Sequence, residues 1–125
     1  MIPKFRVWDT HKEVMNRVDY LDFVNGVIGM SNENVRDCEQ PIHRVKIMQY
    51  TGLKDKNGVE IFEGDVLYHP LQGKRKVYYP YSDSVASYGL REINTGFGST
   101  LQDAHAVWKV IGNIYENPEL LEVAE

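Results

Sequence analysis

The chain has 125 residues, of which 42% are hydrophobic, 11% aromatic and 26% charged, a composition typical of one ordinary globular domain. No stretch approaches the roughly 20 apolar residues that span a bilayer, the first residues lack the apolar core of a signal peptide, and Cys38 is the single cysteine, so we expect a protein of the reducing cytoplasm without membrane contact. The formal net charge is −4, which equals the charge of the last ten residues; the neutral remainder argues against a general nucleic-acid-binding surface and leaves only a local basic patch open.

The N-terminal part shows strand and turn patterns with one ambiguous segment. Residues 4–8 form an aromatic and β-branched run that predicts a short strand. Asn25-Gly26 stands between two apolar runs and predicts a tight hairpin over residues 18–28, because both residues tolerate positive φ. Residues 11–22 are ambiguous. Thr10 to Glu13 matches a capping box, which favours a helix, but the second half of the segment alternates like a strand. We favour a strand there and keep the helix as the alternative.

The central part predicts short strands separated by turns. Residues 30–43 are mostly polar and predict a loop. Asn57-Gly58 and Glu63-Gly64-Asp65 are turn sequences, and Pro80 ends the strand before it or confines that strand to a sheet edge. We therefore expect strands at residues 45–50, 59–62, 66–68 and 76–79.

The C-terminal part contains the least regular segment and the best candidate for a central strand. Residues 82–105 are rich in Ser, Thr and Gly and predict a long loop. Residues 106–115 carry apolar side chains in both alternating sets, which predicts burial on both sides or a bulge near Gly112. Asn117-Pro118 favours the start of a short helix that ends near residue 123.

Three motifs resemble the opening, middle and closing motifs of the YopX family of phage and prophage proteins. They are Pro3-Lys4-Phe5-Arg6-Val7-Trp8-Asp9, then Met48-Gln49-Tyr50-Thr51-Gly52-Leu53-Lys54-Asp55-Lys56-Asn57-Gly58 continuing through Ile61-Phe62-Glu63-Gly64-Asp65-Val66, and Val110-Ile111-Gly112-Asn113-Ile114-Tyr115-Glu116-Asn117-Pro118-Glu119-Leu120-Leu121. The resemblance implies a bacterial host, a mobile genetic element and a β fold that contains an SH3-like barrel. It implies no activity, because the family has no established catalytic residues.

Pattern and resemblance together predict an all-β fold: an SH3-like barrel with an N-terminal β-hairpin layer and a short C-terminal helix. We expect a single domain over residues 1–125. Within it, residues 1–30 form the hairpin region and residues 44–117 form the barrel, with a loop insertion near 82–105.

Residue types that carry catalysis or bind metals are scattered. The histidines, at positions 11, 43, 69 and 105, have no metal-binding spacing. Acidic neighbours disfavour a reactive thiolate, which argues against a Cys38–His43 nucleophile pair. The carboxylate pairs Glu63/Asp65 and Asp19/Asp22 fit turns better than an acid–base site. We therefore predict no enzyme, no metal and no cofactor.

The segment 74–81 is the strongest candidate for a binding surface. Lys74, Arg75 and Lys76 run into Tyr78, Tyr79 and Tyr81, and the charges should stay hydrated near a hairpin tip. Positive charge beside rings suits single-stranded nucleic acid, whereas aromatic clusters of SH3-like barrels suit peptides. The plainer interpretation is a solvated turn followed by a strand that packs its tyrosines.

Tyr50, before Thr51-Gly52, is a further candidate because it could line a groove, although a packed strand end is the simpler interpretation. Taken together, the sequence predicts a non-enzymatic phage or prophage accessory protein that acts by binding or assembly. We favour an unidentified protein partner, with nucleic acid as the alternative. Eight tyrosines and two tryptophans also predict a homo-oligomer.

Overall fold

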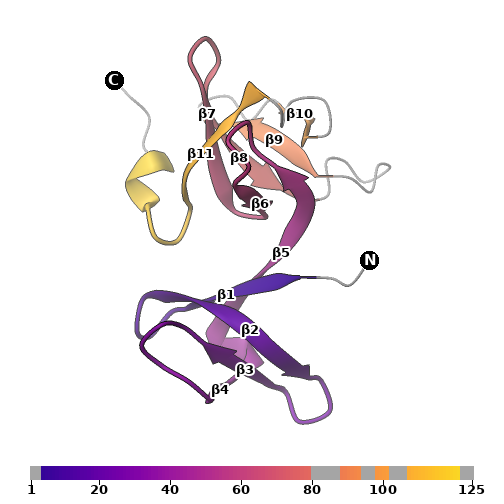
Figure 1. The fold of residues 1–125 in the computed structure, drawn as a ribbon, viewed down its shortest axis with the longest axis vertical. Helices are drawn as coiled ribbons and strands as arrows, with labels where there is room; N and C mark the ends of the chain where they lie inside the picture. Colours follow the sequence, from indigo (N-terminus) through magenta and orange to yellow (C-terminus); the bar gives the residue numbers. More distant parts are fainter. Residues whose placement is uncertain (1–3, 80–87, 94–97, 102–106, 122–125) are drawn as a thin grey trace. The chain divides into compact units, whose positions relative to one another are not determined.

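The computed structural model describes residues 4–79, 88–93, 98–101 and 107–121. Tyr81, and most of the predicted loop at 82–105, lie outside the described residues. Strands dominate, and the described helices are single 3₁₀ turns, η1 at Ile42–Arg44 and η4 at Pro118–Leu121 (Figure 1). The all-β prediction is confirmed, and the short C-terminal helix is a 3₁₀ turn. Within the described residues, no helix is long and apolar enough to span a bilayer.

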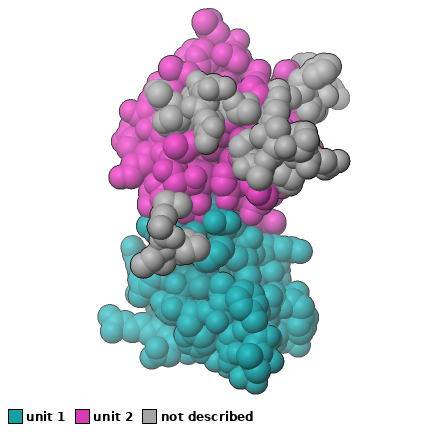
Figure 2. Space-filling model, turned by 90° about the vertical axis from the view of Figure 1, so that its right-hand side faces the viewer, with its two compact units in different colours: residues 1–49 teal, residues 50–125 magenta. Residues whose placement is uncertain are grey.

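The chain divides into two compact units, Met1–Gln49 and Tyr50–Glu125, coloured separately in Figure 2. The boundary falls inside one strand, β5 at Val45–Lys54, whose halves pair in different units. The sequence predicted one domain over residues 1–125, with its barrel starting at residue 44.

Unit 1 is an antiparallel sheet in the order β4-β3-β2-β1-β5. The buried side chains Val7, Ile28, Met30 and Val45 form its core. The ambiguous segment 11–22 is a strand, as favoured, because its alternating half joins the sheet between two partners. The other strands of this sheet are β1 at Phe5–Asp9, β2 at Val14–Asp22, β3 at Val27–Ser31 and β4 at Cys38–Pro41.

Two local predictions in unit 1 are wrong. The β2–β3 connection is a four-residue turn in which Gly26 has φ +68° and Asn25 keeps negative φ, so it is not the tight two-residue turn. The Asp22 carboxylate organises this turn by accepting hydrogen bonds from the backbone N–H groups of Val24 and Asn25 and from the Asn25 amide. The predicted loop at 30–43 contains β4, because backbone pairing with β3 orders residues that carry little apolar signal.

Unit 2 is an antiparallel sheet in the order β10-β9-β8-β7-β11, and the second half of β5 pairs with β6. One face of this sheet, with Ile61 from β6, encloses a core of Leu67, Val77, Leu90, Leu101 and Trp108. The strands are β6 at Glu60–Phe62, β7 at Asp65–His69, β8 at Gly73–Tyr78, β9 at Gly89–Glu92, β10 at Gly98–Thr100 and β11 at Lys109–Asn113.

Unit 2 corrects two expectations. The predicted loop at 82–105 contributes β9 and β10, and Leu90 and Leu101 belong to the core. The segment 106–115 is an edge strand and not a central one, although the bulge before Gly112 is confirmed. Within the described residues β10 and β11 stand at opposite ends of the sheet and do not pair, so no closed barrel is seen.

The free edge of β11 is covered by the loop between β5 and β6. Asp55 is buried there and accepts hydrogen bonds from the backbone N–H groups of Asn57 (2.8 Å), Val59 (2.9 Å) and, across the fold, Val110 (2.9 Å). Burial alone would raise the Asp55 pKa, but these three donors outweigh it and hold the pKa below its ordinary value. The N–H of Lys56 donates to the carbonyl of Trp108. Asp55 and Lys56 therefore form hydrogen bonds with the edge of β11 that a neighbouring strand would otherwise form.

Candidate binding surfaces

Residues 74–78 of the candidate segment 74–81 fall on β8 and divide between the two faces of the sheet. Alternation places Arg75 with the buried Val77 on the core face and places Lys74, Lys76 and Tyr78 on the opposite face. The three consecutive charges therefore do not form one surface.

Arg75 is a structural residue in unit 2. Its guanidinium carbon lies 5.4 Å from the ring centre of buried Trp108, and Nη1 donates to the Ser99 hydroxyl at 3.2 Å. The His69 ring lies 5.3 Å from Trp108. The expectation that all three charges stay hydrated is wrong for Arg75, because strand alternation turns it toward the core.

Replacing Arg75 with alanine should lower the free energy of unfolding by about 1–2 kcal/mol, through loss of the cation–π contact and of the packing of its stem. The same replacement of Lys76, which lies on the outer face, should change it by no more than about 0.5 kcal/mol. Urea denaturation followed by circular dichroism compares the two variants. Equal losses would contradict the assignment of opposite faces.

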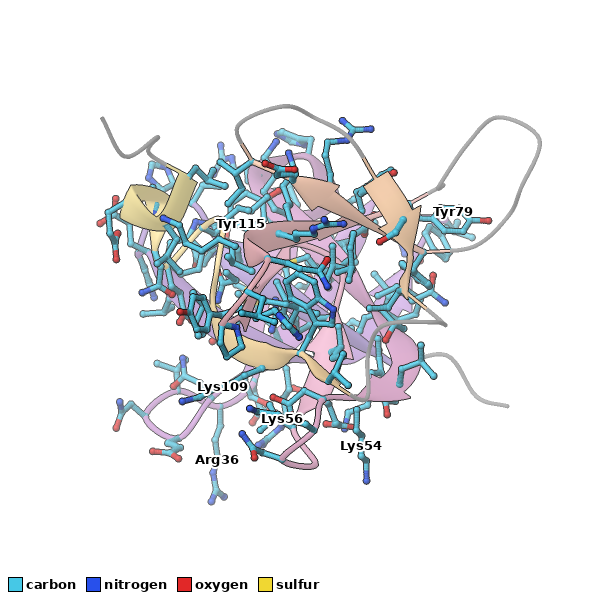
Figure 3. All side chains as sticks on the ribbon, turned by 90° about the horizontal axis from the view of Figure 1, so that it is seen from above. Arg36, Lys54, Lys56, Tyr79, Lys109 and Tyr115 are labelled. Atoms are coloured by element: carbon cyan, nitrogen blue, oxygen red, sulfur yellow. The ribbon has the colours of Figure 1, made fainter. Side chains whose placement is uncertain are left out.

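The outer face of the unit 2 sheet gathers cations from three strands. Lys109, Tyr68 and Lys74 are direct cross-strand partners in one row, and Lys76 and Arg91 are partners in the next. We call this surface the basic face and define it as Lys74, Lys76, Arg91 and Lys109 with Tyr68 and Tyr78. Lys56 adjoins it, because its loop bonds to Trp108 next to Lys109; Figure 3 labels both lysines on one side of the unit.

Within the described residues, none of the four cations of the basic face forms an ion pair with a carboxylate. Glu92 is the partner of Arg75 and so belongs to the core side, while Asp55 and Asp65 are buried and accept backbone hydrogen bonds. The face is therefore positive although the chain is negative overall.

The remaining candidate tyrosines have different environments. Tyr78 lies over Gly89, its cross-strand partner, and Arg91 lies 4.2 Å from its ring centre. Tyr79 is exposed and contacts Tyr88, with ring centres 5.1 Å apart. Tyr50 packs against Phe62, and Thr51 donates to the carbonyl of Ile61, so this pair closes the β5–β6 ladder.

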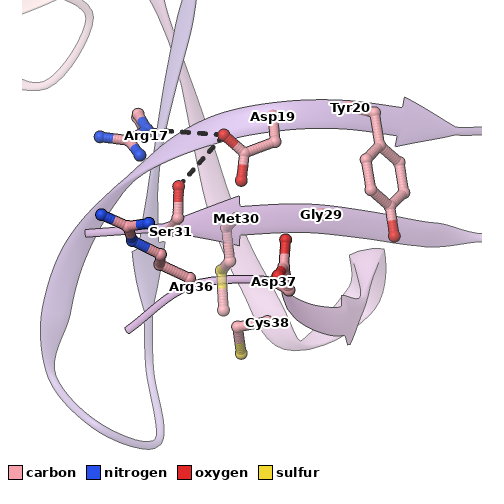
Figure 4. Close-up of a pocket in the computed structure, with 9 residues that line it drawn as sticks. All are labelled: Arg17, Asp19, Tyr20, Gly29, Met30, Ser31, Arg36, Asp37 and Cys38. Carbon is pink, nitrogen blue, oxygen red and sulfur yellow. Dashed lines mark hydrogen bonds and ion pairs between the residues drawn. The ribbon is translucent and has the colours of Figure 1, made fainter. Parts of the chain in front are cut away.

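Unit 1 contains an open pocket of about 550 Å³ that the sequence did not indicate (Figure 4). Arg17 pairs with Asp19 at 3.5 Å, and the Ser31 hydroxyl donates to the same carboxylate at 3.1 Å. Tyr20 lies across Gly29 and donates to Glu39, and this hydrogen bond raises the Tyr20 pKa. The lining residues are Arg17, Asp19, Tyr20, Gly29, Met30, Ser31, Arg36, Asp37 and Cys38.

Two arginines and two aspartates make this pocket nearly neutral, so it has no evident preference for a charged ligand. Within the described part of the chain, no three His, Cys, Asp or Glu side chains are grouped as metal ligands. The pocket residues come from β2, β3, the segment leading into β4 and the first residue of β4, and no local motif links Arg17 to Arg36.

The profile of the YopX protein family matches residues 4–122 of the chain. The chain belongs to the YopX family. Among solved structures, protein EF1440 from Enterococcus faecalis is 32% identical, with a TM-score of 0.67 over 98% of this chain and 99% of that one. The protein YopX from Bacillus subtilis is 20% identical, with a TM-score of 0.57 over 98% of each chain. At this identity the similarity establishes a shared fold and nothing further. No match to a curated protein was found.

Membership in the YopX family confirms the resemblance carried by the three sequence motifs. The match extends across both units, from β1 to just beyond η4, so both compact units belong to the family's domain.

Proposed function

We propose that this YopX-family protein is a non-enzymatic binding module of a phage or prophage that acts in the cytoplasm of the bacterial host. The observation that carries the proposal is the basic face, where four cations from β8, β9 and β11 share one surface without a carboxylate partner among the described residues. Leaving like charges together is unfavourable in a free protein, and an acidic partner would relieve that repulsion.

The test is capture of partners from host cells that carry the element. Tagged wild-type protein should retain an acidic macromolecule, protein or nucleic acid, that a Lys74→Gln/Lys76→Gln/Lys109→Gln variant loses at least tenfold. Glutamine keeps the length and hydrogen bonding of the side chain but removes its charge. The bound material is identified by mass spectrometry and by nuclease digestion.

The matched control is Lys12→Gln/Arg44→Gln/Lys46→Gln, which removes three exposed charges from unit 1. Both triple variants have the same net charge, so a general electrostatic effect would weaken both alike. Equal loss in the two variants, or full retention in the first, would reject the basic face as the contact surface.

We infer that assembly into a homo-oligomer is the second candidate role. The turn between β2 and β3 exposes 79% of Phe23 and 94% of Val24, and Leu71 is 90% exposed at the β7–β8 turn. Large exposed apolar side chains of this kind are commonly covered by a partner. Light scattering at micromolar concentration would show a dimer or larger species, and a monomer would remove this candidate.

We also propose that unit 2 is organised as the SH3-like barrel that the family resemblance implies. Its support is a single cluster of core side chains from β6, β7, β8 and β9 that packs with Trp108. Nuclear Overhauser contacts between the strands at the two ends of the sheet would establish closure, and their absence would leave an open sheet.

A further inference from the structure

The basic face combines positive charge with tyrosine rings in a regular array. Neighbouring strands are about 4.8 Å apart and alternate residues along a strand about 6.7 Å apart. Lys109 and Lys74 flank Tyr68 from the two adjacent strands, so their backbones are roughly 10 Å apart. Lys76 follows Lys74 on the same face, and Arg91 lies directly beside Lys76. The cations are therefore spread across three strands and do not form one compact cluster.

The rings of this face are placed between the charges. Tyr68 is 41% exposed and has a lysine on each side. Tyr78 has Arg91 against its ring. Cations that follow a phosphate backbone, with aromatic side chains on which bases stack, are the two components of single-strand binding.

The same composition is poorly suited to the centre of a protein interface. Such centres are depleted of charged residues, lysine above all, and are built on apolar anchors. The six residues of the basic face are four cations and two tyrosines, and Val66, the cross-strand partner of Lys76 on the same face, is 0% exposed and so presents no apolar anchor. The exposed apolar residues Phe23, Val24 and Leu71 lie on turns and outside this face.

We propose that the basic face binds single-stranded nucleic acid through its phosphates and stacked bases, without base-sequence specificity. This inference rests on the proposed function and names the chemistry of the partner. Duplex is disfavoured because its bases are already stacked on one another and cannot stack on Tyr68.

The test is fluorescence anisotropy of the full chain with a labelled oligo-dT 20-mer and with the corresponding dA·dT duplex, in about 50 mM salt. We expect the single strand to bind at least tenfold more tightly than the duplex. With three or four phosphates neutralised, the slope of log K against log salt should be roughly −2 to −3, at about −0.7 per phosphate.

Variants separate the two components of the site. Lys74→Gln/Lys76→Gln/Lys109→Gln should flatten the slope and weaken binding at least tenfold, whereas the unit 1 control variant should keep the wild-type slope. Tyr68→Leu should weaken binding about fivefold or more while leaving the slope unchanged, because it removes stacking and no charge.

Three results would overturn the inference: no binding of the single strand, equal affinity for the duplex, or equal weakening in both triple variants. Partner capture that depends on the basic face but resists nuclease would also overturn it, and would leave the proposed function standing. Circular dichroism of each variant confirms that the fold is retained.

Discussion

Trp108→Ala should lower the free energy of unfolding of unit 2 by about 3–5 kcal/mol, the largest effect that we expect of any single replacement in the chain. Trp108 is 1% exposed and packs with Leu67, Val77, Leu90 and Leu101. Its removal leaves a cavity that a rigid sheet cannot refill, and it deprives the rings and cations around it of their contact. The loss is a large part of the roughly 5–15 kcal/mol that stabilises a typical domain.

Hydrogen exchange during a urea titration would measure this effect separately for each unit. Amides of β7 and β8 should lose protection in the variant, whereas amides of β2 and β3 should not, because the core of unit 1 contains other residues. Val107→Ala is the matched control, since Val107 is 52% exposed and adjacent in sequence. If both variants exchange alike, Trp108 is not the centre of this core.

Asp55→Asn should cost about 1–3 kcal/mol although the two side chains have nearly the same shape. Oδ1 of Asp55 accepts from Asn57 and Val59, and Oδ2 accepts from Val110. In asparagine one of these atoms becomes an NH₂ group that faces another N–H. At least one buried backbone donor then loses its acceptor, and the edge of β11 is no longer held.

The Asp55 replacement should also change the pH dependence of stability. The folded-state pKa of Asp55 is lowered, so its stabilising charge is fully present above the unfolded value of about 3.9 and is lost as pH falls toward the folded value. The difference between wild type and variant should therefore shrink below about pH 4. Urea midpoints measured from pH 7 to pH 3 check this, and a constant difference would contradict the assignment.

Asp22→Asn provides the comparison for Asp55. Asp22 also accepts hydrogen bonds within a turn, chiefly from the Asn25 side chain, and its pKa is lowered too. Its turn lies in solvent, where water can replace a lost partner, so we expect a smaller loss than at Asp55.

The fold class was predictable because most strands carry their own signal. Alternation, β-branched residues and turn sequences indicated the strands of residues 4–8 and 45–50 and those that flank Gly64, and the structure contains them. β4, β9 and β10 were missed because their ordering comes from pairing with β3, β8 and β9, respectively, and not from their own residues. Short polar strands at or near a sheet edge have little local pattern to detect.

Only part of the basic face could be predicted from the sequence, for a related reason. Lys74 and Lys76 stood out within one run, but Arg91 and Lys109 reach the same face through the registers of β9 and β11. One available signal was overlooked: Val77 is the clear aliphatic core candidate of β8, and alternation from it assigns Arg75 to the core side.

Because the ribosome synthesises the chain from its N-terminus, the position of Trp108 determines when the core of unit 2 can form. The buried core side chains of unit 1 have all been synthesised by Met48, whereas unit 2 lacks its central tryptophan and the Val110 partner of Asp55 until residue 110 has been added. Until then Leu67, Val77 and Leu90 have emerged without their cover. Translation that stops before Trp108 would thus release a product in which unit 1 is folded and the apolar side chains of unit 2 are exposed. Such a product would be bound by chaperones and degraded by proteases.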